Sequence, residues 1–422
     1  MERPYLTKHK LGELVEVTRG ASLSGEYYAE EGKLVRLTLG NFDLNGGGFK
    51  LNTSKTDLYF TGPVKENFIL SKGDIITPLT EQTIGLLGAT ARIPESGKYI
   101  QSQDVALIRC KEGLLYPNYC YYLISSKMVR NQLSAAAQQT KIRHTSPDKI
   151  KDCTVCIPSY EEQVRIGDLL VEIDEKINLN KSINHNLEVM VKQLYDYWFM
   201  QFDFPDENGK PYKSSGGAMV YNENLKRNIP EGWNDGIFAD IANITMGQSP
   251  DGSSYNETGK GEIFYQGSTD FGIRFPSVRM YTTSPTRYAK QGDILMSVRA
   301  PVGAVNIANS DCCIGRGLSA INSMIGSITY IYYVVHYLKV RFDNLNTAGT
   351  TFGSITKDEL FNLPVVVPSN DVIERFEVIC KPIFNKQMEI GFEIESLDKQ
   401  RNELLPLLMN GQASLNYDLS NG

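Results

Sequence analysis

Few residues in this sequence have the types and spacing that metal binding would require. Cys153 and Cys156 have the Cys-x-x-Cys spacing of half a zinc site, but no second pair or nearby histidine completes four ligands. A similar segment occurs again 210 residues further on, and its matching positions hold the apolar residues Leu363 and Val366. We therefore interpret both cysteines as buried strand residues and expect no metal site.

The sequence also lacks a recognisable catalytic arrangement. Gly315-Arg316-Gly317 imitates part of a dinucleotide-binding fingerprint, but its surroundings are β-rich and no long helix follows. The chain has no Walker A lysine loop and no Asn-Pro-Pro-aromatic motif, and its four histidines are scattered without triad spacing. Asp174 and Glu175 could be paired as nuclease carboxylates, but a solvated charged turn of a helix explains them better. We predict that the chain is not an enzyme.

The clearest feature of the sequence is a stretch that occurs twice. It begins with Pro158-Ser159 and again with Pro368-Ser369, an offset of 368 − 158 = 210 residues that holds for about 40 residues without a gap. Both copies have an apolar seam that advances by alternating steps of four and three residues, which indicates a coiled coil. Polar residues interrupt the seams at Asn180, Asn184, Gln387 and Arg401. We predict two helices, each about 60 Å long, that pack on each other.

The segments before the two helices also resemble each other. Each contains short β-type runs broken by glycine, with Gly73-Asp74 in the first matched by Gly292-Asp293 in the second. Between such landmarks the halves diverge, most clearly over residues 45–64 and 252–287. Residues 117–136 predict a single helix within the first half. Like scaffolds with unlike loops suggest duplicated modules that recognise different things.

Charge neither favours nor excludes a nucleic-acid ligand. The net charge is −6 overall, but residues 1–157 have 20 basic and 16 acidic residues, a net of +4, whereas residues 158–204 have 4 and 9, a net of −5. The acid is therefore largely on the helices, where solvated faces usually carry it. The start of the chain has no apolar signal segment, and seven cysteines without framework spacing fit reduced thiols. We expect a cytoplasmic protein.

Over essentially its whole length this architecture resembles the specificity subunit of type I restriction–modification systems. The resemblance is carried by two variable β-rich halves, each with a Gly-Asp-Ile turn and a closing Pro-Ser, and by the long helix that follows each, the first ending in Trp198-Phe199. It implies an α+β fold with two target recognition domains, an antiparallel helix pair between them and an internal pseudo-twofold repeat. The expected domains are residues 1–157 and 230–367 for recognition, 158–204 and 368–412 for the helices, 205–229 for a linker and 413–422 for a tail.

The resemblance also implies the partners. Each recognition domain would bind one half of a bipartite double-stranded DNA target, while the helices set the spacing and dock two methyltransferase subunits. Those subunits, rather than this chain, would hold S-adenosylmethionine and methylate adenine, and restriction subunits could join the complex. Two alternatives stay open: an anti-restriction or scaffold protein that binds methyltransferase subunits without reading DNA, and a nuclease with an unrecognised site.

Candidate DNA-contacting residues follow from the base-edge preferences of arginine for guanine and of asparagine or glutamine for adenine. Arg299 is the best single candidate because it follows the Gly292-Asp293 turn at the position matched by Thr80. Gly73-Asp74 and Gly292-Asp293 themselves are expected to form turns. The full set is Arg36, Asn41, Thr80, Gln82, Arg92, Gln138, Gln139, Lys141, Arg143, Gln266, Ser268, Arg274, Arg279, Arg299, Arg316, Thr350 and Thr351.

Overall fold

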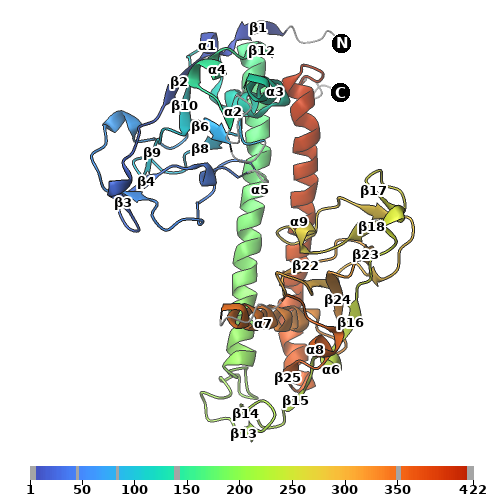
Figure 1. Ribbon diagram of the computed structural model, residues 1–422. Helices are drawn as coiled ribbons and strands as arrows, with labels where there is room; N and C mark the ends of the chain where they lie inside the picture. Colours follow the sequence, from blue (N-terminus) through green and yellow to red (C-terminus); the bar gives the residue numbers. More distant parts are fainter. Residues whose placement is uncertain (1–5, 44–46, 82–84, 137–142, 348–352, 416–422) are drawn as a thin grey trace, which may run out of the picture. The chain divides into compact units, whose positions relative to one another are not determined.

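Two helices are far longer than all other elements of the computed structural model, which describes residues 6–43, 47–81, 85–136, 143–347 and 353–415 (Figure 1). The helix α5 spans Tyr160–Tyr195 and continues into a π-helical turn at Asp196–Met200, and α9 spans Asn370–Met409. Each begins one residue after the serine of its Pro-Ser pair, and Glu161, Glu162 and Asp371 lie in the first turns. Acidic residues there favour helix initiation because they face the positive end of the helix dipole.

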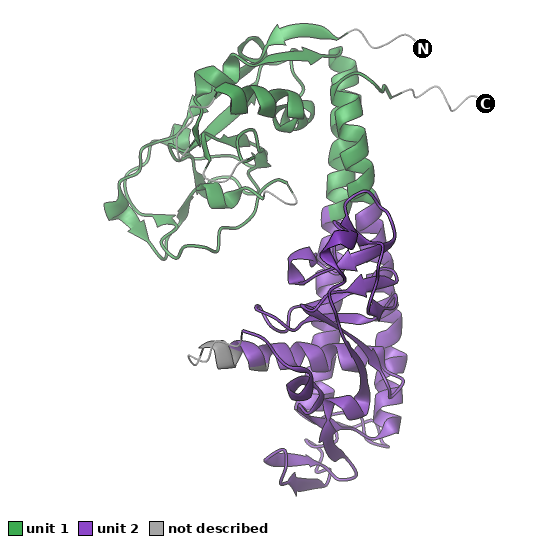
Figure 2. Ribbon diagram, turned by 45° about the vertical axis from the view of Figure 1, so that its right-hand side comes forward, with its two compact units in different colours: residues 1–177, 397–422 green, residues 178–396 purple. Residues whose placement is uncertain are grey.

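The chain divides into two compact units, residues 1–177 with 397–422 and residues 178–396 (Figure 2). In the first unit Ile166 and Leu170 of α5 share one core with Leu404 and Leu408 near the end of α9. In the second unit the end of α5 shares a core with the beginning of α9, through Trp198 and Phe376 among others. Within each unit the helices therefore pack antiparallel, as predicted.

Three polar side chains of the seam, on Asn180, Gln387 and Arg401, bond across the helix pair. In the second unit Asn180 donates a 2.9 Å hydrogen bond to Glu393, and Gln387 donates one of 3.0 Å to Glu188. In the first unit Arg401 forms a 2.7 Å ion pair with Asp174. Burial lowers the pKa of Arg401, but the hydrogen bond to Asp174 and the nearby carboxylates outweigh this and raise it overall. A buried polar group costs free energy when unpaired, so each pair favours one alignment of the helices.

The first unit contains a β-rich domain built from two small sheets. One sheet has the order β2-β10-β6-β8 and the other β3-β5-β4-β9, and the strands β1 and β12 pair beside the beginning of α5. The bounds are β1 Thr7–Lys10, β2 Val15–Arg19, β3 Tyr28–Ala29, β4 Leu34–Arg36, β5 Tyr59–Phe60, β6 Ile75–Pro78, β7 Thr80–Glu81, β8 Ala91–Arg92, β9 Tyr99–Ile100, β10 Val105–Cys110, β11 Arg143–His144 and β12 Thr154–Ile157, with the short helices α1 Leu11–Leu14 and α4 Pro147–Lys151.

The second unit repeats this arrangement. The order β16-β24-β21-β22 matches the first sheet, β17-β19-β18-β23-β20 matches the second, and β15 pairs β25 as β1 pairs β12. The bounds are β15 Asn234–Ile237, α6 Phe238–Ile241, β16 Ala242–Met246, β17 Tyr255–Asn256, β18 Glu262–Tyr265, β19 Tyr281–Thr282, β20 Tyr288–Ala289, β21 Ile294–Ser297, β22 Val305–Ile307, β23 Cys312–Ile314, β24 Leu318–Ser323, α7 Ile328–Thr347, α8 Lys357–Phe361 and β25 Pro364–Val367. The α+β fold with two similar β-rich domains is therefore confirmed.

Two details differ from the sequence interpretation. The single helix expected over residues 117–136 is two helices, α2 (Pro117–Ser125) and α3 (Lys127–Ala136), because Ser126 has an extended backbone and its hydroxyl donates to the Leu123 carbonyl. The segment interpreted as a linker contains a hairpin of β13 (Met219–Asn222) and β14 (Arg227–Pro230). It packs by aromatic contacts, with Phe204 stacked between Tyr212 and Trp233.

The strands β2 and β16 end at matching glycines that touch another part of the backbone. A Cβ atom on Gly20 would lie 2.3 Å from the Gln101 carbonyl oxygen, and one on Gly247 would lie 2.2 Å from that of Gly315. Equivalent backbone hydrogen bonds follow, from Ala21 to Gln101 and from Gln248 to Ile314, each 3.0 Å. Both contacts join the two sheets of a domain, and only glycine permits them.

We predict that Gly247→Ala lowers the free energy of unfolding by about 1–3 kcal/mol, because the added methyl group forces two backbone segments apart. Gly252→Ala is the matched control, since a Cβ atom there would meet nothing within 4 Å. Denaturant unfolding of both variants measures the difference. Equal stability of the two variants would contradict the close contact.

Candidate nucleic-acid interface

In both β-rich domains, the residues just after the strand that follows the Gly-Asp turn pair through their backbone with a later segment of the same domain. We call this pairing the edge of the domain. In the first domain Thr145 donates a 2.8 Å backbone hydrogen bond to Leu79, and Thr80 pairs with His144. In the second, Ile355 donates a 2.9 Å bond to Val298, and Arg299 pairs with Ser354. The offsets, 298 − 79 = 219 and 355 − 145 = 210, equal those of the sequence landmarks. The duplicated scaffold therefore presents Thr80 and Arg299 at equivalent places.

In the second domain this edge borders an open hollow of about 370 Å³. Arg299 and Arg316 both line it and both are exposed. Among the residues that the structure describes, neither side chain makes a hydrogen bond or ion pair. Each guanidinium has five N–H donors in a planar fork, which can bind a guanine edge or a phosphate. The other lining residues are Met246, Val298, Gly353, Ser354 and Ile355.

Arg316 is held at the hollow by the glycines on either side of it. Gly315 donates a 2.8 Å backbone hydrogen bond to Tyr265, and a Cβ atom on Gly317 would lie 2.6 Å from the Gln266 carbonyl oxygen. Gly315-Arg316-Gly317, which resembled part of a nucleotide-binding fingerprint, is therefore a place where two backbone segments cross closely. The crossing brings Gln266, another exposed candidate, next to Arg316. Ser268 lies half-buried in a short turn nearby.

In the first domain the equivalent edge has a different chemistry. Glu81 is almost fully buried and accepts hydrogen bonds from the backbone of Gly85, Leu86 and Leu87. The same carboxylate forms a 2.9 Å ion pair with Arg143. Thr80 is itself buried at the pairing. Glu81 thus orients the Arg143 guanidinium, and the second domain has Ala300 at the matching position.

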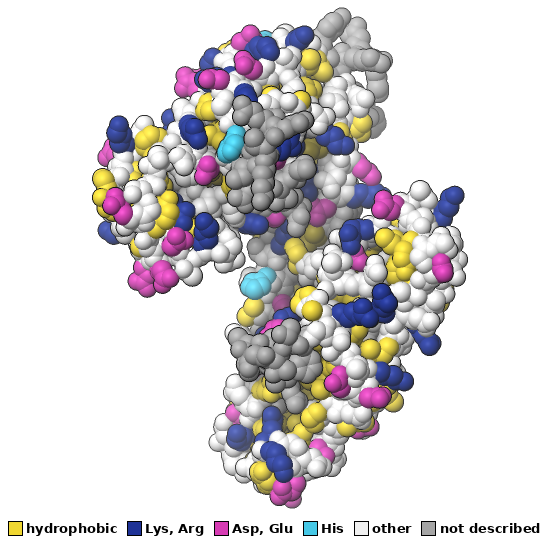
Figure 3. Space-filling model, in the orientation of Figure 1, with side chains coloured by type: hydrophobic (Ala, Val, Ile, Leu, Met, Phe, Trp, Pro, Cys, Tyr) yellow, Lys and Arg dark blue, Asp and Glu magenta, His cyan; other side chains and the backbone are white. Residues whose placement is uncertain are grey.

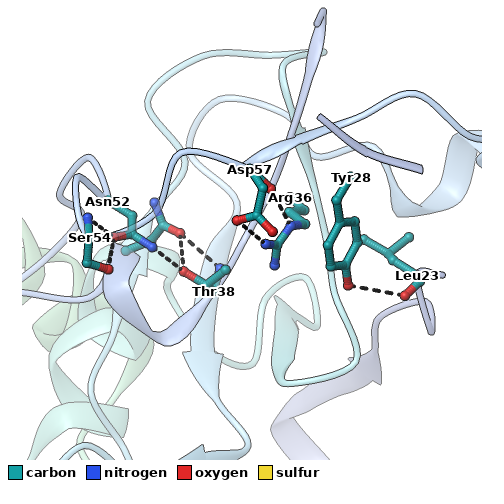
Figure 4. A network of polar contacts seen from close by, with 8 residues as sticks. Leu23, Tyr28, Arg36, Thr38, Asn52, Ser54 and Asp57 are labelled. Atoms are coloured by element: carbon teal, nitrogen blue, oxygen red, sulfur yellow. Dashed lines mark hydrogen bonds and ion pairs between the residues drawn. The ribbon is translucent and has the colours of Figure 1, made fainter. Parts of the chain in front are cut away.

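Arg36 lies in a polar network inside the first domain (Figure 4), and Asn41 bonds to Thr38 of that network. Arg36 is 7% exposed, its guanidinium forms a 3.1 Å ion pair with Asp57, and it lies 3.8 Å from the centre of the Tyr28 ring. Asn41 is 2% exposed and accepts a 2.9 Å hydrogen bond from the Thr38 backbone. A base contact by either residue would require these internal interactions to break.

The remaining described candidates are also paired within the protein. Arg92 donates to Asn118 at 2.8 Å, and its guanidinium lies over the Tyr121 ring. Arg279 is 61% exposed although it is paired with the buried carboxylate of Asp270. Arg274 is 8% exposed and faces Glu188 on α5, so it does not lie on an open surface.

Six candidates lie outside the described residues, namely Gln82, Gln138, Gln139, Lys141, Thr350 and Thr351. Two residues that the sequence interpretation missed belong to the same edges. Glu81 orients Arg143, and Ser354 lines the hollow beside Arg299. The 210-residue offset, which aligns Ser354 with His144, was the signal that could have identified Ser354.

No group of histidine, cysteine and carboxylate side chains that could hold a metal ion is present among the described residues. Cys153 is buried, and its burial raises the pKa of the thiol to about 11, which disfavours the thiolate that zinc requires. On the face shown in Figure 3, basic side chains are interspersed with acidic ones. In the described part of the chain, no helix is both apolar enough and long enough to cross a membrane.

Comparison with known proteins supports the same interpretation. Residues 6–189 and 230–404 each match the family described as type I restriction modification DNA specificity domain. The putative type I restriction enzyme MjaX specificity subunit of Methanocaldococcus jannaschii is 29% identical over 392 residues, which cover 86% of this chain and 85% of the relative. The MjaIX specificity subunit of the same organism is 25% identical over 317 residues, 72% of this chain and 70% of the relative.

A solved structure shows the same fold over the whole chain. The crystal structure of the S subunit of a type I restriction-modification system from M. genitalium matches with a TM-score of 0.61 at 18% identity, covering 99% of this chain and 98% of that one. The two matched domains together account for most of the sequence. The chain belongs to the type I restriction–modification DNA specificity family, as a specificity subunit that contains two such domains.

Proposed function

We propose that each β-rich domain of this specificity subunit binds one half of a bipartite double-stranded DNA target. The observation that carries the proposal is the shared edge that presents different side chains in the two domains. Arg299 and Arg316 are exposed at the second edge, and their side chains have no hydrogen-bond or ion-pair partner among the described residues, whereas Arg143 is held by a buried carboxylate at the first. A common backbone with different donors suits two domains that read different sequences.

The helix pair would set the distance between the half-sites and bind the methyltransferase subunits. Several large apolar side chains on the helices are exposed, including Leu179 at 57%, Val378 at 75% and Ile379 at 46%. Such residues on otherwise charged helices support binding of a partner protein, since exposed apolar groups are costly in water. Two methyltransferase subunits would supply S-adenosylmethionine and the methylation of adenine, and restriction subunits could join them.

The chain itself would contribute recognition and no catalysis. We expect the purified chain, mixed with DNA, Mg²⁺ and S-adenosylmethionine, to produce neither methylated nor cleaved DNA. The same mixture with a methyltransferase subunit from a closely matched type I system should methylate adenines on both strands of a discontinuous motif. Cleavage or methyl transfer by the chain alone would favour the nuclease alternative. A stable complex that methylates nothing would favour the scaffold alternative.

We predict that Arg299→Ala relaxes specificity in only one half of the target. Loss of a two-pronged base contact removes about 1–3 kcal/mol of discrimination against the wrong base. The control is Arg287→Ala, which removes an exposed arginine of the same domain that does not line the hollow. Methylation mapping on plasmid DNA identifies the motif that is methylated with each of the two variants. Changes in both halves would contradict separate recognition by the two domains.

We predict that lengthening both helices widens the gap between the half-sites. One heptad is inserted between Ile177 and Asn178 and another between Ser396 and Leu397, where the two compact units divide. Seven helical residues add about 10 Å, which corresponds to about three base pairs of the duplex. A heptad in one helix alone is the control, because it breaks the seam register and should abolish activity. An unchanged gap in the double insertion would refute the spacing role.

A further inference from the structure

Arg274 is buried and takes part in a polar contact that joins the second β-rich domain to both long helices. Its guanidinium faces the Glu188 carboxylate on α5 at 3.4 Å, and Gln387 on α9 donates a 3.0 Å hydrogen bond to the same oxygen. The guanidinium also lies 4.8 Å from the centre of the Phe384 ring and 5.5 Å from that of Tyr332. One carboxylate oxygen therefore receives a donor from the domain and a donor from the opposite helix.

The next residue makes an apolar contact with α9. The Phe275 ring lies against Gly391, where a Cβ atom would be 2.5 Å from the ring, and 4.8 Å from the ring of Phe392. Gly391 is a helical glycine whose lack of a side chain makes room for this ring. Residues 271–276, hereafter the anchoring loop, thus contact α5 through Arg274 and α9 through Phe275.

The anchoring loop is also joined firmly to its own domain. Ile307 of β22 donates a 2.9 Å backbone hydrogen bond to Arg274. The Asn306 side chain accepts a bond from the Gly272 backbone nitrogen and donates one to its carbonyl, each 3.0 Å. A rotation of the sheet relative to the helices would therefore break the contacts at Glu188 and Gly391 together.

The pair of Arg274, whose side chain is 7% exposed, and Glu188, whose side chain is 27% exposed, is suited to fixing an orientation rather than adding stability. Charges withdrawn from water lose hydration free energy that offsets much of their attraction, so such pairs contribute little net stability, but removing one partner leaves the other charge uncompensated. The Nε and Nη2 atoms of Arg274 are buried and have no hydrogen-bond partner among the described residues, so Glu188 is the principal polar partner of its guanidinium there. His336 lies 3.9 Å from Glu188, and burial lowers its pKa despite the nearby carboxylate.

We propose that Arg274 and Phe275 are positioning residues that fix the second domain on the helix pair, and thereby the length of DNA spacer that the subunit accepts. The inference rests on the proposed function, since it requires that the domain reads a half-site. It assigns Arg274 a role at the helices rather than at a base, because its guanidinium is enclosed by Glu188, Tyr332 and Phe384.

The test uses the full chain in complex with the matched methyltransferase subunit. Plasmids carry the two half-sites separated by the normal spacer or by spacers one base pair shorter and longer, and adenine methylation of each is sequenced. The variants are Arg274→Met, which keeps the packing but removes the charge, and Gly391→Ala. Alanine is the better helix former, so any loss with Gly391→Ala comes from the displaced Phe275. Lys386→Met is the control, because it breaks an exposed ion pair with Glu389 on the same helix.

We expect both variants to raise methylation of the altered spacers relative to the normal one by about 2-fold to 30-fold, with the bases of both half-sites unchanged. Arg274→Lys, which keeps the charge, should restore most of the spacer preference, and Lys386→Met should match the wild type. A reduced melting temperature with an unchanged spacer preference would overturn the proposal, leaving only a structural role. A changed base in the second half-site would also overturn it, because Arg274 would then read DNA.

Two results separate this inference from the proposed function. If the wild-type complex methylates no split motif, the proposed function itself fails. If the wild type methylates one split motif and Gly391→Ala folds and keeps its spacer preference, the positioning role is refuted even where Arg274→Met does not fold, and recognition stands.

Discussion

The packing of α5 against α9 is the contact on which the rest of this protein depends. Each β-rich domain buries its own helices against this pair, so α2 meets α5 at Asp168, which accepts from Asn118 at 2.6 Å. In the second unit α7 begins against α9, where Ser327 donates to Glu377. Carboxylates of the long helices thus bind the beginning of a helix in each domain. The seam gives the pair its register, and that register determines where both domains attach.

One carboxylate of α5 in each unit also joins the β-rich domain to α9. Asp174 accepts hydrogen bonds from Tyr122 at 2.6 Å and from Arg401 at 2.7 Å, so it joins a domain helix and the partner helix in the first unit. Glu188 does the same in the second unit, with Arg274 and Gln387 as the donors. The two carboxylates are separated by 188 − 174 = 14 residues, which is two heptads, and therefore face the same side of the helix.

Arginines of this chain that look alike in the sequence have different surroundings in the structure. Arg36 and Arg274 are buried and paired with acids, and Arg143 is oriented by Glu81. Arg299 and Arg316 are exposed at a hollow, and within the described part of the chain their side chains have no polar partner. Guanidinium groups that are paired with carboxylates within the protein stabilise the backbone and the domain contacts. The guanidinium groups at the hollow can instead bind a ligand. This difference narrows the candidate interface of the second domain to Arg299, Arg316 and their neighbours.

The sequence by itself determined the repeated architecture, because heptad spacing and a constant offset are local and periodic signals. Seam residues such as Ile177, Asn180 and Gln387 are buried as predicted, and the Gly-Asp turns have their glycines at φ 88. The sequence only outlined the short strands, and it missed the helix break at Ser126, where the backbone is extended and the hydroxyl donates to the Leu123 carbonyl. The sequence could also not separate the exposed arginines from those that are paired within the protein. Their acid partners are distant in the chain, with Arg274 and Glu188 separated by 86 residues, and only tertiary packing brings the two charges together.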